Sequence, residues 1–308
     1  MKLMMISFFS FLAHNSYSQS AENNPDSINT RKWLAPAVHV TAIGASLYAL
    51  NKSWYAKYPS QSFHTVNDMN NWRMMDKCGH AWSAYNLARL SAPVWQQNGS
   101  SKKQAVYYAG FTALSYQTII ELCDGFSSKW GFSWGDMGAN ITGTLTYVLQ
   151  EALLNKQVVQ IKFSSFKKIN YSPDIYDRAD FLFGHTFSSR LLNDYNAQTY
   201  WASINFKSVF PKTKLPGWFN IALGYGARQM LGETNNRWTN KNNVVVDRSD
   251  ITRYSRFLIS PDIDFTQLKT HHTWLRVLLF VANAIKIPAP ALEYNSRGKF
   301  NFHLLLLN

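Results

Sequence analysis

The stretch YWASINFKSVF, at Tyr200–Phe210, alternates between apolar and polar residues, as expected for a half-buried β-strand. Upstream, DMGANITGTLTYVLQEAL, at Asp136–Leu153, instead repeats its apolar residues with the period of an α-helix. The change of period falls after Lys156. It predicts an α+β protein, with a helical domain at residues 32–156 and an antiparallel β-rich domain at residues 157–308.

Further elements extend this pattern in both directions. Four helical patterns predict an N-terminal bundle of about four helices. Alternation predicts further strands at residues 218–225, 257–265 and 300–306, and an apolar stripe predicts a helix at residues 272–287. A complete outer-membrane barrel needs at least about eight strands, so it is the minority interpretation. The predicted helices lie at residues 33–50, 76–90, 102–123 and 136–153.

The first 31 residues are predicted to lie outside the folded domains. Lys2, the apolar residues 3–13 and the small residues Ser16 and Ser18 have the order of a secretory signal peptide, which we assign to residues 1–18. Residues 19–31 are polar and are predicted to be a flexible lead-in. No cysteine lies near the expected cleavage point, which argues against lipid attachment. We therefore expect an exported protein of the periplasm or outer membrane of a Gram-negative cell.

Composition points to a membrane. Charged residues make up 16% of the chain and aromatic residues 15%, which is typical of a protein with surface at a lipid interface. Residues 33–50 contain no charge, so they fit either a membrane-spanning helix or a buried core helix. The formal charge is +13, and residues 157–308 hold +9 of it without a run of five basic residues. We expect membrane lipid or a cell-wall polymer as the partner and no nucleic acid, with a solvated basic surface as the alternative.

Three helices each carry a polar pair in apolar surroundings. The spacing of three or four residues places both members of a pair on one side of a helix. Carboxylates in an apolar bundle must pair, titrate or bind a cation, so the pairs predict a shared centre. The candidate catalytic residues are His80, Glu121, Asp124 and Asp136, and the same four are the candidate ligands of a divalent metal. The supporting residues are Asp76, Lys77 and Asn140.

Structural roles compete with this interpretation. Ser133 and Asp136 have the spacing of a helix cap, Asp124-Gly125 fits a helix end, and a lone His80 is more often structural. Cys78 and Cys123 could form a disulfide in an oxidising compartment. Each cysteine lies about 200° around its helix from the acid two residues before it. The disulfide and a shared acidic centre are therefore competing hypotheses.

The motifs that carry these residues resemble a known family. DKCGH at residues 76–80, ELCDGF at residues 121–126 and SWGD at residues 133–136, followed by Asn140 and Gly143, resemble the YfiM-like family of predicted periplasmic lipoproteins of unknown function. The resemblance covers residues 50–155, and the layout is distantly similar to that of VanZ-like membrane proteins. It implies an envelope location and no particular reaction. The missing lipidation cysteine and the added β-rich half depart from the family pattern.

Two functions follow from these patterns. The first is a non-enzymatic envelope protein, in which the helical half anchors at a membrane and the basic β-rich half engages lipid or cell-wall material. The second is a membrane-associated enzyme, with a divalent metal as its possible cofactor, that acts on a lipid or glycan. In that case His80 is the general base or a metal ligand, and neighbouring carboxylates are its partners.

Overall fold

The computed structural model describes residues 33–166 and 169–307. The predicted signal peptide and lead-in therefore lie outside the described residues. Two compact units divide the described chain. The helical unit contains residues 33–68, 83–157 and 268–282. The sheet unit contains residues 69–82, 158–267 and 283–307, apart from residues 167 and 168.

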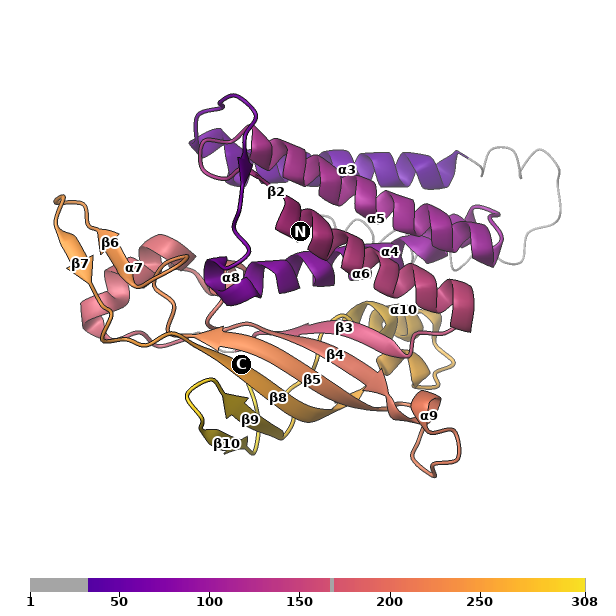
Figure 1. Ribbon diagram of the computed structural model, residues 1–308. Helices are drawn as coiled ribbons and strands as arrows, with labels where there is room; N and C mark the ends of the chain where they lie inside the picture. The colour runs from indigo at the N-terminus through magenta and orange to yellow at the C-terminus, as the bar shows by residue number, and fades with distance from the viewer. Residues whose placement is uncertain (1–32, 167–168, 308) are drawn as a thin grey trace. The chain divides into compact units, whose positions relative to one another are not determined.

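Four helices of the N-terminal half are α3 (Leu34–Ser53), α4 (Met75–Gln97), α5 (Lys102–Gly125) and α6 (Trp134–Leu154) (Figure 1). The residues of α4 up to Trp82 belong to the sheet unit, and the rest of α4 belongs to the helical unit. The helical unit also contains α10 (Thr273–Ala282). The short strands β1 (Thr65–Val66) and β2 (Phe132–Ser133) pair in parallel.

Helices α5 and α6 lie side by side in the helical unit. Ala105, Ala109 and Ala113 of α5 are fully buried. A Cβ atom at Gly110 would lie 2.5 Å from Cγ2 of Val148 on α6, so glycine permits the close approach of the two helices. Ser101 caps the start of α5 in a capping box with Gln104.

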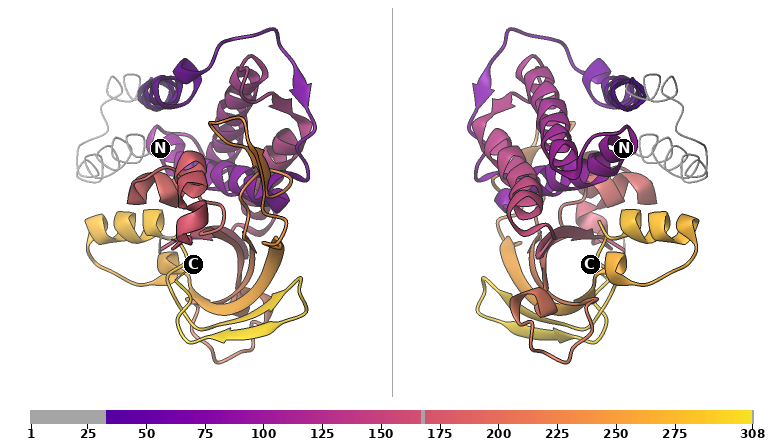
Figure 2. Two further views of the ribbon diagram at one scale, coloured as in Figure 1. Left: turned by 90° about the vertical axis from the view of Figure 1, so that its left-hand side faces the viewer. Right: turned by 90° about the vertical axis from the view of Figure 1, so that its right-hand side faces the viewer.

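Six antiparallel strands form the main sheet: β3 (Val159–Ser164), β4 (Thr199–Asn205), β5 (Phe219–Arg228), β8 (Tyr254–Ile263), β9 (Ala291–Asn295) and β10 (Phe300–His303). Their spatial order, β10-β9-β8-β5-β4-β3, follows the chain. Figure 2 shows that the sheet is strongly curved. The helices of the first half and this antiparallel sheet confirm the predicted α+β class.

Shorter elements connect the strands. Helices α7 (Pro173–Phe183) and α8 (Phe187–Asn193) precede β4, and α9 (Phe206–Val209) follows it. The hairpin of β6 (Arg237–Thr239) and β7 (Val245–Asp247) lies between β5 and β8 in the chain. At the β3 edge of the sheet, Phe163 exchanges backbone hydrogen bonds with Ala284 and Lys286. This edge of the described sheet is therefore partly covered by an extended segment.

Two predicted elements end five residues earlier than expected. The predicted strand at residues 200–210 stops at Asn205, because the Asn205 side chain accepts a hydrogen bond from the backbone N–H of Ser208 and caps α9. The predicted helix at residues 272–287 stops at Ala282, because the buried Asn283 side chain donates to Gln160 and accepts from the backbone N–H of Phe265. The residues that follow Asn283 then pair with β3.

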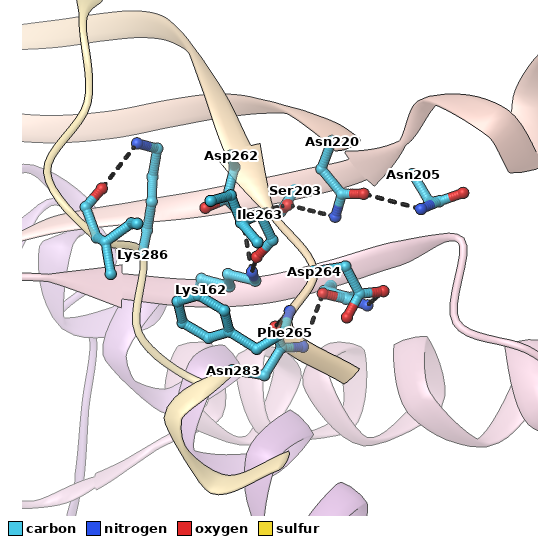
Figure 3. Close-up of polar contacts among 12 residues, drawn as sticks. Lys162, Ser203, Asn205, Asn220, Asp262, Ile263, Asp264, Phe265, Asn283 and Lys286 are labelled. Atoms are coloured by element: carbon cyan, nitrogen blue, oxygen red, sulfur yellow. Dashed lines mark hydrogen bonds and ion pairs between the residues drawn. The ribbon is translucent and has the colours of Figure 1, made fainter. Parts of the chain in front are cut away.

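The buried side of the sheet carries many polar groups, and Figure 3 shows the contacts among some of them. Lys162 Nζ lies 2.8 Å from Asp262 Oδ2 and donates to the carbonyl oxygen of Ile263 at 2.7 Å. Ser203 donates to the same carboxylate oxygen at 2.6 Å, and Asn220 donates to Ser203 at 2.9 Å. In β4 the polar residues Ser203 and Asn205 are buried, while Ile204 between them is partly exposed. The alternation of this strand thus buries its polar side.

Candidate functional site

Asp76 and His80 lie one turn apart at the start of α4, as their spacing predicts. His80 Nε2 is 3.9 Å from Asp76 Oδ1, and Lys77 Nζ donates to Asp76 Oδ2 at 3.2 Å. The hydroxyl of Tyr195 donates to Asp76 Oδ1 at 2.9 Å. Burial alone would raise the pKa of Asp76, but the charges of His80 and Lys77, with the hydrogen bonds from Tyr195 and Lys77, hold it below its usual value. Asp76 is therefore an ionised carboxylate at neutral pH.

A strained turn sets the position of this end of α4. Trp72, Arg73 and Met74 have φ angles of 49°, 52° and 64°, a region that residues other than glycine rarely occupy. The strands hold the turn, because the hydroxyl of Tyr225 donates to the carbonyl oxygen of Arg73 at 2.6 Å and Arg73 Nε donates to Ser255 at 2.9 Å. Such strain persists only where surrounding structure enforces it, and it often marks a functional position.

Glu121 and Asp136 are both buried in the helical unit near Ser133. The Ser133 backbone N–H donates to Glu121 Oε2 at 3.4 Å, and its hydroxyl accepts from the Asp136 backbone N–H at 3.1 Å. The same hydroxyl donates to Asp68 Oδ1 at 2.5 Å. Asn140, one turn after Asp136 on α6, is fully buried. Ser133 thus caps α6 and also gathers acidic residues from three segments of the chain.

Asp124 has a different environment. Its Oδ1 accepts a hydrogen bond of 2.7 Å from the hydroxyl of Tyr55, which lies in the short helix η1 (Tyr55–Lys57). Burial raises the pKa of Tyr55 well above its usual range, and the charge of the nearby Asp124 carboxylate raises it further. Asp124 is half-buried, unlike Glu121 three residues earlier. Its described partner is therefore a neutral phenol that donates a hydrogen bond.

Both cysteines are free thiols. Burial, with a smaller contribution from Asp76, raises the pKa of Cys78 to about 11. Burial also raises the pKa of Cys123. Neither thiol is therefore activated as a nucleophile at neutral pH.

The predicted site residues divide between the two compact units. Asp76, Lys77 and His80 belong to the sheet unit, and the other predicted residues, Glu121, Asp124, Asp136 and Asn140, belong to the helical unit. Within each unit the residues lie in contact with polar partners, and α4 runs without interruption from one unit into the other. The shared centre itself stays a prediction.

Three site residues were not predicted from the sequence. Asp68 lies in an irregular segment, and Tyr195 and Tyr55 are far in sequence from the carboxylates that they contact. The only signal in the sequence for Asp68 is the run Asn67-Asp68 that follows an aromatic-rich stretch. Contacts of such long sequence separation do not follow from helical spacing.

Residues 67–152 match a protein family described as predicted periplasmic lipoprotein (DUF2279). The matched segment contains the DKCGH, ELCDGF and SWGD motifs and extends almost to the end of α6. The description agrees with the coarser part of the resemblance drawn from those motifs, a predicted periplasmic lipoprotein. No curated protein and no solved structure matches the chain.

Proposed function

We propose that this chain is a membrane-associated protein of the bacterial cell envelope, with a structural or binding role at a lipid or cell-wall surface. The observation that carries the proposal is the exposed apolar side of α3. The description of the matched family supports the envelope location.

Helix α3 has two different sides. On one side, His39 stacks on Trp95 with ring centroids 4.9 Å apart, and the Ser46 hydroxyl forms a short hydrogen bond with the hydroxyl of Tyr116. On the other side, Val40 and Tyr48 are each 71% exposed. The helix is long and apolar enough to cross a membrane, and only 17% of its apolar window is buried. A helix of this kind in water would expose a large apolar surface, whereas lipid would cover it.

Vesicle flotation tests this role. We expect the wild-type chain to float with phosphatidylethanolamine–phosphatidylglycerol vesicles. Val40→Asp should weaken the binding of α3 to the bilayer by more than about a hundredfold, because an aspartate in the hydrocarbon costs about 3 kcal/mol. Asn242→Asp adds the same charge in the exposed β6–β7 turn and should float like the wild type. A wild-type chain that stays at the bottom of the gradient would overturn the proposal. A Val40→Asp variant that floats normally would overturn the role of α3 as the membrane contact.

A second candidate function is a metal-dependent enzyme that acts on a lipid or glycan. The burial of Glu121, Asp136 and Asn140 in the helical unit favours it. The predicted ligands His80, Glu121, Asp124 and Asp136 offer imidazole nitrogen and carboxylate oxygen, the donor atoms that many divalent cations accept. A bound cation would supply Lewis-acid catalysis. His80 would then serve as a ligand or as the group that accepts a proton, and Asp76 would orient its imidazole.

Metal analysis of the purified protein distinguishes the two functions. For the enzyme, we expect about one equivalent of a divalent metal, lost in His80→Ala and in Asp136→Asn with helical content unchanged. His272→Ala removes an exposed histidine and should leave the metal in place. A metal-free wild-type protein, or metal retained in His80→Ala, would remove the enzyme hypothesis and leave the binding role.

A further inference from the structure

The side of the sheet that faces away from the polar interior carries two rows of large apolar residues. One row runs across four strands through Leu223, Ile259, Leu292 and Phe302, and the other runs through Tyr225, Phe257, Tyr294 and Phe300. We call these eight residues the outer face. Tyr225 is partly exposed, and the other seven are between 44% and 80% exposed. The outer face is therefore a continuous apolar surface without a charged group.

The opposite side of the same strands is buried and carries many polar groups beside a small apolar cluster around Trp201 and Leu258. In β8, Arg256, Ser260 and Asp262 are buried, while Phe257 and Ile259 between them are exposed. In β9, Glu293 is buried between the exposed Leu292 and Tyr294. Arg256 pairs with Glu293 at 3.3 Å in the interior. This arrangement is the reverse of a sheet in water, where the apolar side of each strand is buried.

Strands with a polar inner side and an apolar outer side occur where the outer side meets lipid. A single exposed apolar residue is ordinary in a soluble protein, but a continuous patch across four strands marks an interaction surface. The surface consists of side chains with little polarity, so hydrocarbon is the environment that it fits best.

Basic residues lie at one end of the outer face. Arg297 and Lys299 lie in the turn between β9 and β10 and are exposed, and the Arg297 guanidinium stacks on Tyr254 at 4.1 Å. Cations beside an apolar surface attract the negative surface of an anionic bilayer. The excess of +9 in residues 157–308 acts in the same direction. Charge and apolar surface therefore indicate the same occupant.

We propose that the outer face of the sheet lies against the acyl chains of an anionic phospholipid membrane, with Arg297 and Lys299 at the headgroups. This contact deepens the proposed function, on which it rests, because it adds a second lipid surface to α3. The sheet contact predicts that lipid reaches residues more than two hundred positions away from α3 in the chain.

Depth-dependent fluorescence quenching tests the contact. Single cysteines replace Ile259 or Leu292 in a full-length chain that carries Cys78→Ala and Cys123→Ala, and each is labelled with an environment-sensitive nitrobenzoxadiazole probe. The protein is mixed with phosphatidylethanolamine–phosphatidylglycerol vesicles that contain acyl-chain nitroxides. We expect a severalfold rise in emission and strong quenching at both positions. A probe at Asn242, in the β6–β7 turn, should show neither change.

A probe at Val40 on α3 separates this inference from the proposed function. Quenching at Val40 without quenching at Ile259 and Leu292 would overturn the sheet contact and leave the α3 proposal intact. Quenching at the sheet positions alone would support the contact and overturn the α3 proposal. Shielding of the sheet probes without vesicles, with a dimer by light scattering, would show that a second copy covers the outer face and would overturn the lipid contact. Circular dichroism of each labelled chain checks that it is folded.

Discussion

The helical unit and the sheet unit fill their interiors with different kinds of side chain. In the helical unit, alanines such as Ala84, Ala88 and Ala109 are fully buried and let helices approach closely. In the sheet unit, Lys162 and Lys286 are fully buried beside the apolar Trp201, while many large apolar residues of the strands lie on the exposed outer face. The helices therefore pack through small apolar side chains, whereas the sheet buries many polar groups and exposes a row of large apolar residues, contrary to the usual distribution.

This difference shows what alternation in a sequence can and cannot predict. A period of two identifies a strand and places its residues on two sides. It does not say which side is buried, because the same pattern fits a soluble sheet with an apolar core and a sheet that faces lipid with a polar interior. The predictions below test the polar interior of the sheet unit against the helical unit.

The largest effect is expected from the buried ion pair of the sheet. Lys162→Met leaves Asp262 without its buried cation and should lower the free energy of unfolding by about 3–5 kcal/mol. The double variant Lys162→Met/Asp262→Leu should recover most of this loss. Lys102→Met breaks the exposed Lys102–Glu151 pair of the helical unit and should lower stability by about 1 kcal/mol or less. Urea unfolding of the four chains measures these differences, and an equal loss in both single variants would contradict the contrast.

The next effect concerns pH. The pKa of Lys286 is lowered to about 8, mainly by burial. The negative charge of Asp262 raises this pKa, and the positive charge of Lys162 lowers it further. Between pH 8 and about 10.5 the unfolded chain binds more protons at this residue than the folded chain, so folding becomes more favourable as pH rises. Relative to Lys286→Met, the wild type should gain about 3 kcal/mol of stability over this window. A difference between the two chains that does not change with pH would show that Lys286 titrates normally.

A smaller effect is expected where α5 meets α6. Gly110→Ala places a Cβ atom 2.5 Å from Val148 and should lower stability by about 1–2 kcal/mol. Gly138→Ala, on an open side of α6, should instead raise stability by about 1 kcal/mol, because alanine favours a helix. Thermal unfolding gives the sign of each change. Two stabilising substitutions would mean that the α5–α6 contact is looser than described.

The smallest effect is expected at the cap of α6. Ser133→Ala removes the hydroxyl that accepts from Asp136 and donates to Asp68, and should lower stability by about 1 kcal/mol. Ser101→Ala removes the cap of α5, which is exposed, and should cost about half as much. If Ser133→Ala does not change the thermal stability of the chain, the acidic residues around Ser133 are held by other contacts.

Much of the fold could be predicted from the sequence. Helices α5 and α6 begin and end within about two residues of their predicted bounds, because their apolar period is long and their caps are recognisable. Strands β3 and β9 were not predicted. Their buried positions hold polar residues such as Lys162 and Glu293, which do not mark a core in sequence. The sequence prediction thus missed these two strands of six and five residues, although it found β4 and β8, whose buried sides also hold polar residues.

The candidate site could be predicted only in part. Helical spacing correctly placed Asp76 beside His80, and the cap pattern correctly linked Ser133 to Asp136. The contact of Asp76 with Tyr195 and the strained turn at Trp72 depend on the tertiary fold of the sheet unit. The spacing of apolar and polar residues within one helix or strand carries no information on contacts between residues more than a hundred positions apart.

A spin-label scan of β8 tests most directly the central claim that this sheet is polar inside and meets lipid outside. Nitroxides are placed one at a time at Phe257, Leu258, Ile259 and Ser260 in the vesicle-bound chain, and collision rates are measured with oxygen and with a water-soluble nickel complex. We predict high oxygen and low nickel accessibility at Phe257 and Ile259, and low accessibility to both reagents at Leu258 and Ser260. High nickel accessibility at Phe257 and Ile259 would show that the outer face meets water and would contradict the claim.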